Sequence, residues 1–318
     1  MHITEHIKKA AGKTLFSIEI LPPLKGKGIE SVFKGIDPLM EFEPAFIDVT
    51  YHREEFIMKK LKDGTFERIS TKKRPGTVAI CAAIMNKYKV DTVPHLICGG
   101  FTKEETENAL IDLNFLGIDN VLVLRGDNVK NEPNFVPEKN GNHNALELLM
   151  QVKNLNKGKY LDEEIEDAIA TKFCCGVAGY PEKHYEAPNK KSDLAFLKKK
   201  VDEGADFIVT QMFFDNKKYF DFVELCRTNG INIPIIPGIK PLTSKKQLSG
   251  LSKIFHIDMP ETLVDEVEKC KDDKEVKQLG LDWCVDQCKE LKAAGVPVLH
   301  FYTMGLSEAT RYIATRVF

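Results

Sequence analysis

Short apolar runs recur along the chain, and the longer segments between them carry apolar residues at helical spacing. The runs are rich in β-branched and aromatic residues and end at Pro, Gly or polar positions, which is the pattern of buried strands. Eight runs fit it: residues 16–21, 46–52, 90–98, 121–124, 173–180, 207–214, 234–239 and 298–303. Because strand and helix alternate so regularly, the chain is predicted to form a parallel sheet with helical crossovers.

Helices are predicted in the intervening segments. Thr102 followed by Glu105 forms a capping box, which marks the start of a helix. Residues 78–85 could also form a strand, but residues 90–98 fit a strand better because a Gly-Gly pair ends them. The predicted helices cover residues 29–42, 71–88, 102–113, 146–155, 162–171, 193–203, 217–228 and 244–254, two more helices up to Ala294, and residues 307–315.

The number of units favours one closed barrel over two domains, although a chain of 318 residues suits either. Eight units of about 40 residues predict a (β/α)8 TIM barrel with extra helices, a single domain over residues 1–318 that begins with a helix at 1–13. An open doubly wound sheet usually has a Gly-rich phosphate turn after its first strand. Here Leu21-Pro22-Pro23 stands at that place, and neither G-x-G-x-x-G nor a Walker A sequence occurs.

The first run places a carboxyl group among apolar residues, because Glu19 lies near its C-terminal end. Side chains alternate across a strand, so Ser17, Glu19 and Leu21 share one face and the apolar residues between them share the other. A carboxylate that faces an apolar interior is desolvated, which raises its pKa toward neutral and lets it donate a proton. The alternative is a structural ion pair with a Lys or Arg.

Composition excludes several classes of function. The hydrophobic fraction of 43% and the charged fraction of 29% are those of a soluble globular protein. Lys and Arg number 45 against 47 Asp and Glu, so no excess positive charge is available to bind nucleic acid. No apolar run approaches the roughly 18–20 residues that span a bilayer, and residues 1–11 lack the apolar core of a signal peptide. We therefore expect no membrane partner and a cytoplasmic location.

The eight cysteines agree with a reducing compartment, because they are scattered in apolar contexts without a Cys-x-x-Cys pair. We interpret them as reduced core residues. Cys284 and Cys288 stand one helical turn apart and could share a metal ion. No His follows at a zinc-finger spacing and the segment is amphipathic, so no metal is predicted.

Polar residues gather where the predicted strands end. In a barrel of this kind the active site lies at the C-terminal ends of the strands. Taken singly, each of these residues could be a structural hydroxyl, a loop histidine or part of an ion pair. Together, so many large polar side chains at the strand ends need hydrogen-bonding partners, which a polar and partly aromatic ligand would supply. The residues are Glu19, Thr50, His95, Arg125, Asp127, Tyr180, His184, Gln211 and Tyr302.

Eight motifs resemble, in order, those of methylenetetrahydrofolate reductases of the bacterial, catalytic-domain-only type. They are FSIEILPP (16–23), DVTY (48–51), PHLIC (94–98), LRGD (124–127), YPEKH (180–184), TQMFFD (210–215), IPGI (236–239) and HFYT (300–303). The resemblance covers nearly the whole chain. It implies an FAD-containing barrel that reduces 5,10-methylenetetrahydrofolate to 5-methyltetrahydrofolate with NADH or NADPH as hydride donor, and so feeds one-carbon and methionine metabolism.

The resemblance also implies catalytic roles. Glu19 is similar to the family's general acid, which protonates the bridging nitrogen so that the five-membered ring of the folate opens to an iminium ion. Asp127 is similar to the carboxylate beside the flavin pyrimidine and the pterin, where a negative charge favours departure of the hydride. Gln211, whose amide both donates and accepts, and Tyr302 correspond to substrate-binding positions.

Ten residues fall on positions that contact FAD in the family. Arg125 and Lys200 are cations of the kind that suit its diphosphate. Without the resemblance, Lys200 would be interpreted as part of a solvated helix face, because it lies in the cationic run 198–200. The ten are Thr50, His95, Arg125, Gly126, Asp127, Ala178, Tyr180, His184, Asp193 and Lys200.

The chain also departs from the family's pattern. Where many bacterial relatives carry a Phe that packs on the nicotinamide, Lys245 stands here, and Met-Gly-Leu at 304–306 replaces the usual Leu-Asn-Arg. The aromatic residue usually found on the FAD side of the fourth loop aligns near His143. We expect no C-terminal regulatory domain, and therefore no inhibition by S-adenosylmethionine.

Three functional hypotheses remain open from the sequence. The first is a ping-pong flavoenzyme in which the reduced nicotinamide leaves before the folate binds. The second, suggested by Lys245, is a related flavin subunit that receives electrons from a protein partner. The third is a barrel that only binds folate or flavin. The choice between NADH and NADPH stays open because no ribose-reading residue can be assigned, and the family implies a homo-oligomer.

Overall fold

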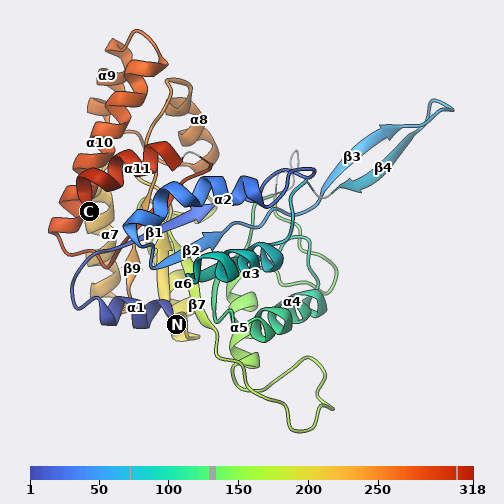
Figure 1. Cartoon of the computed structure of the whole chain (residues 1–318). Coiled ribbons are helices and arrows are strands. Elements are labelled where there is room, and N and C mark those ends of the chain that lie inside the picture. Colours follow the sequence, from blue (N-terminus) through green and yellow to red (C-terminus); the bar gives the residue numbers. More distant parts are fainter. Residues whose placement is uncertain (72, 129–133, 306) are drawn as a thin grey trace.

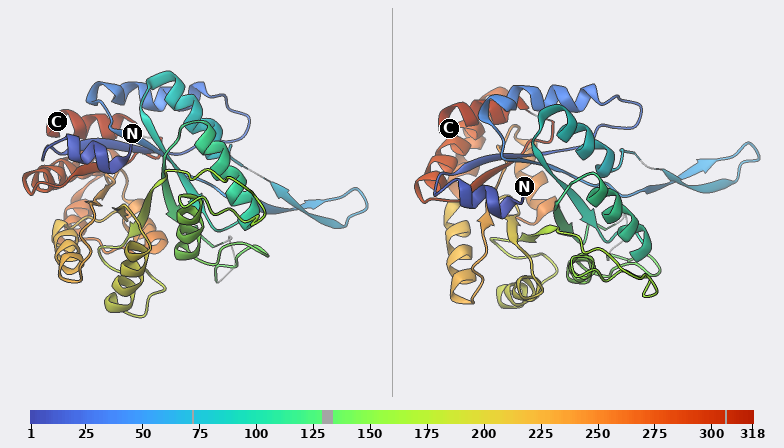
Figure 2. Two further views of the ribbon diagram at one scale, coloured as in Figure 1. Left: turned by 90° about the horizontal axis from the view of Figure 1, so that it is seen from below. Right: turned by 60° about the horizontal axis from the view of Figure 1, so that its bottom comes forward.

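The computed structural model, which describes residues 1–71, 73–128, 134–305 and 307–318, is built on a ring of parallel strands surrounded by helices (Figures 1 and 2). Within the described residues the sheet has nine strands in the order β10-β11-β1-β2-β5-β6-β7-β8-β9. The strands are β1 (Leu15–Ile20), β2 (Phe46–Val49), β5 (Asp91–Ile97), β6 (Asn120–Leu124), β7 (Cys174–Gly179), β8 (Phe207–Thr210), β9 (Ile235–Ile236), β10 (Gly238–Ile239) and β11 (Val298–Tyr302). The predicted parallel barrel is confirmed.

The barrel closes at the seventh predicted strand, residues 234–239. Pro237 divides this strand into β9 and β10, because proline has no N–H for the ladder. β9 pairs with β8 and β10 pairs with β11, so this short segment joins the two edges of the sheet. Each of the eight predicted runs therefore contributes one position around the barrel.

Helices cover the outside of the barrel. The capping box predicted at Thr102 is present: its side chain accepts a hydrogen bond from the Glu105 backbone N–H, and Glu105 caps Thr102 in return. The helices are α1 (Ile3–Lys9), α2 (Glu30–Ile36) with the 3-10 helix η1 (Asp37–Phe42), α3 (Thr77–Tyr88), α4 (Lys103–Phe115), α5 (Ala145–Leu155), α6 (Lys190–Asp202), α7 (Asn216–Thr228), α8 (Lys246–Phe255), α9 (Glu261–Lys269), α10 (Asp273–Ala293) and α11 (Ser307–Val317). No helix among the described residues is both long enough and apolar enough to span a membrane.

Two apolar clusters fix where the polar site can form. The larger lies between strands and helices and contains Phe16, Ile18 and Ile20, which confirms that these residues face away from Glu19. The smaller joins residues of seven barrel strands with one helical residue, so it fills the barrel interior: Ile3, Phe46, Val93, Leu122, Cys174, Phe207, Val209, Ile236 and Val298. The apolar filling leaves room for the polar site toward the C-terminal ends of the strands, while the buried Asn120 side chain at the N-terminal end of β6 accepts a hydrogen bond from the Ile3 N–H.

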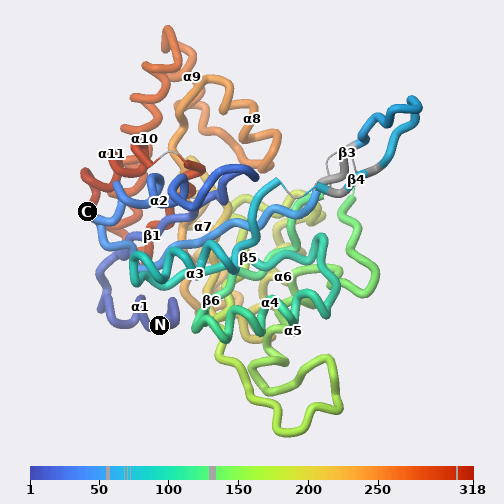
Figure 3. Tube along the Cα trace, turned by 45° about the vertical axis from the view of Figure 1, so that its right-hand side comes forward, coloured from blue at the N-terminus to red at the C-terminus, as the bar shows by residue number. Residues whose placement is uncertain are grey.

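The second connection, between β2 and β5, differs from the prediction of a helix over 71–88. Helix α3 begins only at Thr77, and before it β3 (Glu55–Lys60) and β4 (Phe66–Thr71) form an antiparallel hairpin; residue 72 lies outside the described part of the chain. The hairpin extends away from the barrel (Figures 1 and 3). At its turn the Thr65 hydroxyl and backbone N–H both donate to Asp63. Neither strand alternates polar and apolar residues along its sequence, EFIMKK for β3 and FERIST for β4, so the pattern did not predict the hairpin.

The predicted helix over 162–171 is also wrong. These residues form turns and bends in a long loop below α5 and α4 (Figures 1 and 3). The end of the loop is bound to helix α5, because the Thr171 N–H donates a hydrogen bond to the Leu155 carbonyl. Its apolar residues do not pack on the barrel, since Ile169 is 81% exposed. A segment without a buried face gains too little to form a helix.

Candidate active site

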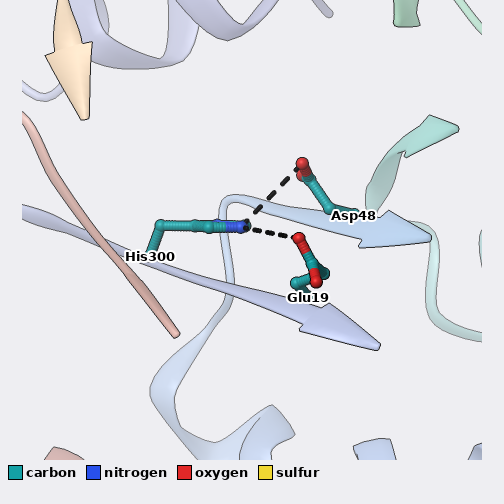
Figure 4. Close-up of side chains that lie close together, drawn as sticks. All are labelled: Glu19, Asp48 and His300. Carbon is teal, nitrogen blue, oxygen red and sulfur yellow. Dashed lines mark ion pairs between the residues drawn. The ribbon is translucent and has the colours of Figure 1, made fainter. Parts of the chain in front are cut away.

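A polar layer lies directly above the apolar filling of the barrel. Ser17 and Glu19 come from β1, Asp48 from β2, His95 from β5 and His300 from β11. The strand register explains their proximity, because Ser17 pairs with His300 and Glu19 with Asp48. Figure 4 shows the His300 imidazole pointing at the carboxylates of Glu19 and Asp48.

The two histidines and the two carboxylates form one ionic network. His95 Nε2 lies 3.4 Å from Asp48 Oδ2 and 3.5 Å from Glu19 Oε2. His300 Nε2 lies 3.9 Å from the same two oxygens, and its Nδ1 shares a 2.8 Å hydrogen bond with the Ser17 hydroxyl. Among the described residues the ion pairs of Glu19 are with these two imidazole groups, and the buried Lys240 lies close enough for its charge to interact with that of Glu19.

Burial makes the charges of this network costly unless they compensate one another. The side chains of Asp48 and His300 are fully buried, while that of Glu19 is 15% exposed. Burial lowers the pKa of His95, but the Asp48 and Glu19 carboxylates outweigh it and the net shift is upward. His95 can thus carry the positive charge that two close carboxylates need in a low-dielectric interior.

The same residues satisfy the distances of a metal site, since Glu19, Asp48 and His300 each have a ligand atom within 4.8 Å of the others. The Ser17 hydrogen bond orients His300, and the charge of His95 offsets those of the two carboxylates. The distances alone do not indicate a metal.

Tyr302 links this network to the neighbouring strands. Its hydroxyl donates to the Thr210 carbonyl at 2.5 Å, and Gly238 makes room because a Cβ at that position would collide with both groups. Burial, together with the Glu19 and Asp48 charges, raises the pKa of Tyr302, so its hydroxyl stays protonated. The residue predicted to bind substrate therefore has a structural partner within the barrel.

A second cluster lies at the ends of β6 and β7 and on α6. Lys200 is only 5% exposed, and its ammonium donates to the Ala178 carbonyl at 2.9 Å. Burial lowers the pKa of Lys200 to about 8, although the Asp193 charge opposes the shift. The alternative of a solvated helix face is thus excluded for Lys200. The Tyr180 and His184 rings lie edge to face at 4.8 Å, and Asp193 accepts from the His184 N–H at 2.9 Å.

The remaining predicted residues lie around these clusters. Arg125 pairs with Glu186 and lies over the Phe135 ring at 5.0 Å. Thr50 Oγ1 donates to the Ile20 carbonyl at 3.4 Å. Three residues complete the set. Gly126 adopts a φ of +86° and lies against the Ile97 side chain, and Asp127 is exposed. The Gln211 side-chain oxygen accepts a hydrogen bond from the Met212 N–H.

Two cavities differ in their relation to the site. One of about 150 Å³ is lined by His95, Tyr51 and Phe101. It is smaller than the roughly 300–1,000 Å³ of ordinary ligand pockets, so it accommodates only part of a large ligand. The other, of about 690 Å³, lies between α7, α9 and α10 and is lined by none of the predicted site residues.

Asp48 and His300 were not predicted as site residues, although both stand in recognised motifs. Asp48 carries a carboxylate inside an apolar strand, which is a signal of the same kind as Glu19. His300 gives no such signal alone. Its role follows only from the register of β1 and β11, which brings together residues 283 positions apart.

The departures from the family pattern that the structure describes lie at the start of α8, just before α5 and just after β11. Lys245 precedes α8, and its backbone N–H donates to Asp273 at 2.9 Å. His143 is exposed and pairs with Glu147. Of residues 304–306, Met304 is exposed with a φ of +44° and Leu306 lies outside the described residues, as do residues 129–133 of the loop before His143.

Comparison with known proteins gives a match over almost the entire chain. A sequence model of the family described as methylenetetrahydrofolate reductase matches residues 2–317. The chain is 33% identical over 321 residues to methylenetetrahydrofolate reductase (NADH) 1 of Arabidopsis thaliana, an alignment that covers 97% of this chain and 49% of the plant protein. It is 29% identical over 309 residues to 5,10-methylenetetrahydrofolate reductase of Escherichia coli, covering 96% and 91% of the two chains.

Among solved structures, a protein from Clostridium thermocellum has the same fold with a TM-score of 0.60 and 15% identity, over 98% of this chain and 96% of that one. That protein is described as binding two copies of 5-methyl-5,6,7,8-tetrahydrofolic acid. At this identity the likeness concerns the fold alone. The chain spans about half the length of the plant and fission yeast relatives, 49% and 46% respectively.

Proposed function

The chain belongs to the methylenetetrahydrofolate reductase family, and from this premise we propose that it reduces 5,10-methylenetetrahydrofolate to 5-methyltetrahydrofolate. The observation that carries the proposal is the placement of Glu19. It lies 15% exposed at the end of β1, above an interior that is closed by apolar residues and beside His95. An acid in this position can reach a ligand at the mouth of the barrel while water reaches it poorly.

Glu19 is proposed to donate its proton to the bridging nitrogen of the folate, which opens the five-membered ring at the carbon that accepts the hydride. Asp48 and His95 support this role through their positions, because the His95 imidazole lies 3.5 Å from Glu19 and 3.4 Å from Asp48 and so fixes the place of the Glu19 carboxyl group. A positioned general acid contributes typically 10²–10⁴-fold to a rate. Asp127 is exposed and can accept hydrogen bonds from the folate, and Gln211 and Tyr302 would contact the rest of the substrate.

FAD is the proposed cofactor, and the β7–α6 cluster fits it. Lys200 is a buried ammonium whose recorded hydrogen bond is to one backbone carbonyl, so it has donors left for a diphosphate. Arg125 also lies near this cluster, since its positive charge interacts with both Tyr180 and His184 and so acts on the pKa of each. When bound, FAD would carry a hydride from the reduced nicotinamide to the folate. NADH or NADPH and the folate would occupy the site in turn, in a ping-pong order.

The experiment that tests this function begins with the visible spectrum of the purified protein. Flavin absorption, its anaerobic bleaching by NADH or NADPH, and formation of 5-methyltetrahydrofolate when 5,10-methylenetetrahydrofolate is then added are the expected results. A colourless protein that binds no added FAD and gives no bleaching with either nicotinamide would contradict the proposal.

A second candidate function is favoured by Lys245. No aromatic ring stands at this position, where the family resemblance implies a Phe against the nicotinamide, and Lys245 begins α8 with its N–H bound to Asp273. The barrel would then be a flavin subunit reduced by a protein electron donor. Rapid anaerobic reduction of the bound flavin by NADH alone would eliminate this candidate, whereas reduction only by a protein donor would establish it.

A further inference from the structure

The larger of the two cavities lies outside the barrel, and none of the proposed site residues lines it. It encloses about 690 Å³ between α7, α9 and α10, which is the size of an ordinary small-molecule pocket. Figure 1 shows these three helices on the outside of the barrel, on the side of the C-terminus. We call this space the outer cavity.

One face of α10 lines the outer cavity with polar and aromatic side chains. Trp283, Asp286, Gln287 and Glu290 stand at helix positions i, i+3, i+4 and i+7, so they share a face. The apolar residues of α10 pack instead into the main core between strands and helices. The polar face is therefore not needed to hold α10 on the barrel.

Two amide side chains in the wall of the cavity are buried but incompletely hydrogen-bonded. Asn216 is 7% and Gln287 5% exposed, and both line the outer cavity. The Asn216 amide nitrogen donates to the main-chain carbonyl of Gln287 at 3.0 Å and to Glu290 at 2.6 Å. The Gln287 amide nitrogen donates to the Phe213 carbonyl at 2.9 Å.

The oxygens of these two amides are the unusual feature. No hydrogen bond from the described residues reaches Asn216 Oδ1 or Gln287 Oε1. Buried polar atoms in proteins nearly always have a partner, and an amide oxygen can only accept. The two oxygens therefore indicate a ligand that donates hydrogen bonds.

The charges around the cavity favour a cation. Asp286 and Glu290 are exposed carboxylates one helical turn apart. Among the described residues that line the cavity the one cation is Lys217, and its ammonium already pairs with Asp221 at 2.6 Å. A positively charged ligand with N–H groups would meet both the carboxylates and the amide oxygens.

The geometry favours an organic cation over a metal ion. Within the described part of the chain, Glu19, Asp48 and His300 are the one group of three such side chains close enough to hold an ion. The carboxylates of the outer cavity form no such group. The cavity also presents the Trp283 ring, which is held in place because its indole N–H donates to a main-chain carbonyl at 3.0 Å. Aromatic faces attract ammonium groups.

We propose that the outer cavity binds an aliphatic compound that carries two or more ammonium groups. These groups pair with Asp286 and Glu290 and donate to the amide oxygens of Asn216 and Gln287, and the aliphatic chain packs on the Trp283 ring. Exposed carboxylates alone attract a cation weakly, so the buried acceptors and the ring supply the specificity. The inference does not depend on the proposed function, because the outer cavity shares no residue with the candidate active site.

The fluorescence of Trp283 tests the proposal directly, because this residue is the single tryptophan of the chain. The purified full chain is titrated with spermidine at about 0.15 M salt, where unspecific attraction between exposed charges is screened. We expect a saturable change in fluorescence with spermidine and none with octanediol, a neutral aliphatic chain. D286N/E290Q and Q287M should each weaken binding about tenfold or more, since each removes acceptors for a charged donor.

The control variant E163Q/E164Q removes the same number of exposed carboxylates from the loop after α5 and should bind spermidine like the wild type. Circular dichroism of each variant without spermidine reports folding, and calorimetric titration measures binding without the tryptophan signal. Absence of saturable binding to the wild type in both titrations, or equal affinities of wild type and D286N/E290Q, overturns the proposal. The same fluorescence change with Mg²⁺ at equal concentration overturns the assignment of an organic ligand.

Discussion

Asp48 Oδ2 lies 3.4 Å from His95 Nε2, and no hydrogen bond from the described residues reaches either oxygen of this fully buried carboxylate. Two strands of the barrel supply the pair, β2 and β5, which are neighbours in the sheet. The charge of His95 is therefore the main compensation for Asp48, and the same imidazole lies 3.5 Å from Glu19. The protonation of one histidine thus influences both the stability of the barrel and the proposed acid.

The Asp48–His95 pair predicts a pH-dependent stability. The folded pKa of His95 is raised, so its contribution is complete below the unfolded pKa of about 6.5 and is lost as pH rises through the folded value. Replacing Asp48 by Ala should cost about 3–5 kcal/mol of unfolding free energy at low pH, the usual cost of breaking a buried pair. The difference between wild type and D48A should shrink as pH rises.

Urea unfolding of wild type and D48A between about pH 6 and pH 9 measures this difference, a range that brackets the ordinary pKa of histidine. D286N, which changes an exposed carboxylate on α10, serves as the control and should give the same small difference at each pH. A D48A difference that does not vary with pH would contradict the assignment of the charge to His95.

Lys200 predicts the pH dependence of cofactor binding. Its pKa is about 8 because it is buried, so the ammonium is charged below that pH and neutral above it. FAD affinity should be flat below about pH 8 and fall as pH rises further, since the diphosphate attracts only the charged form. K200M should weaken FAD binding by about 10- to 100-fold at neutral pH, which corresponds to one charge-assisted hydrogen bond, and should abolish the pH dependence.

Titration of the apoprotein with FAD, followed by flavin fluorescence, provides the measurement. K199M is the matched control, because Lys199 is the exposed neighbour on the same helix, and its FAD affinity should equal that of the wild type. Equal affinities for K200M and K199M would show that Lys200 does not hold the cofactor.

Gly238 predicts a steric effect at the closure of the barrel. A methyl group at this position would collide with the Thr210 carbonyl and the Tyr302 hydroxyl, which hydrogen-bond to each other. G238A should lower the free energy of unfolding by about 1–3 kcal/mol, the range for overpacking. G250A is the control, since a Cβ there meets no atom within 4 Å and alanine favours the helix α8. A thermal unfolding curve of G238A that coincides with the wild type would refute the predicted close packing.

The parallel barrel and the orientation of Glu19 could be predicted because both follow from local patterns. Apolar runs bounded by Pro and Gly gave all eight positions of the barrel, and period-two alternation placed Ser17 and Glu19 on the face opposite Phe16 and Ile18. Local pattern could not reveal the β3–β4 hairpin, because its strands, EFIMKK and FERIST, show no period-two alternation of polar and apolar residues. It also gave a helix over 162–171, where nothing covers a hydrophobic face.

The candidate site was only partly predictable for a different reason. Glu19 could be named from its strand pattern and Lys200 from the family resemblance alone, and the structure gives each a largely buried environment. The partners of Glu19 depend on the closure of the barrel, which brings Ser17 and His300 together across 283 positions of the chain. No pattern within one strand contains that information, so the Asp48 and His300 contacts emerge only from the fold.

The central claim is that Glu19 donates the proton needed for folate reduction, and the reoxidation of the reduced enzyme tests it most directly. Wild type and E19Q are reduced anaerobically with NADH and then mixed with 5,10-methylenetetrahydrofolate in a stopped-flow spectrometer. Glutamine keeps the shape of the side chain but cannot act as an acid in this range of pH. The account predicts that E19Q retains flavin and is bleached like the wild type, but is reoxidised by the folate about 10²–10⁴-fold more slowly. Reoxidation of E19Q at the wild-type rate would contradict it.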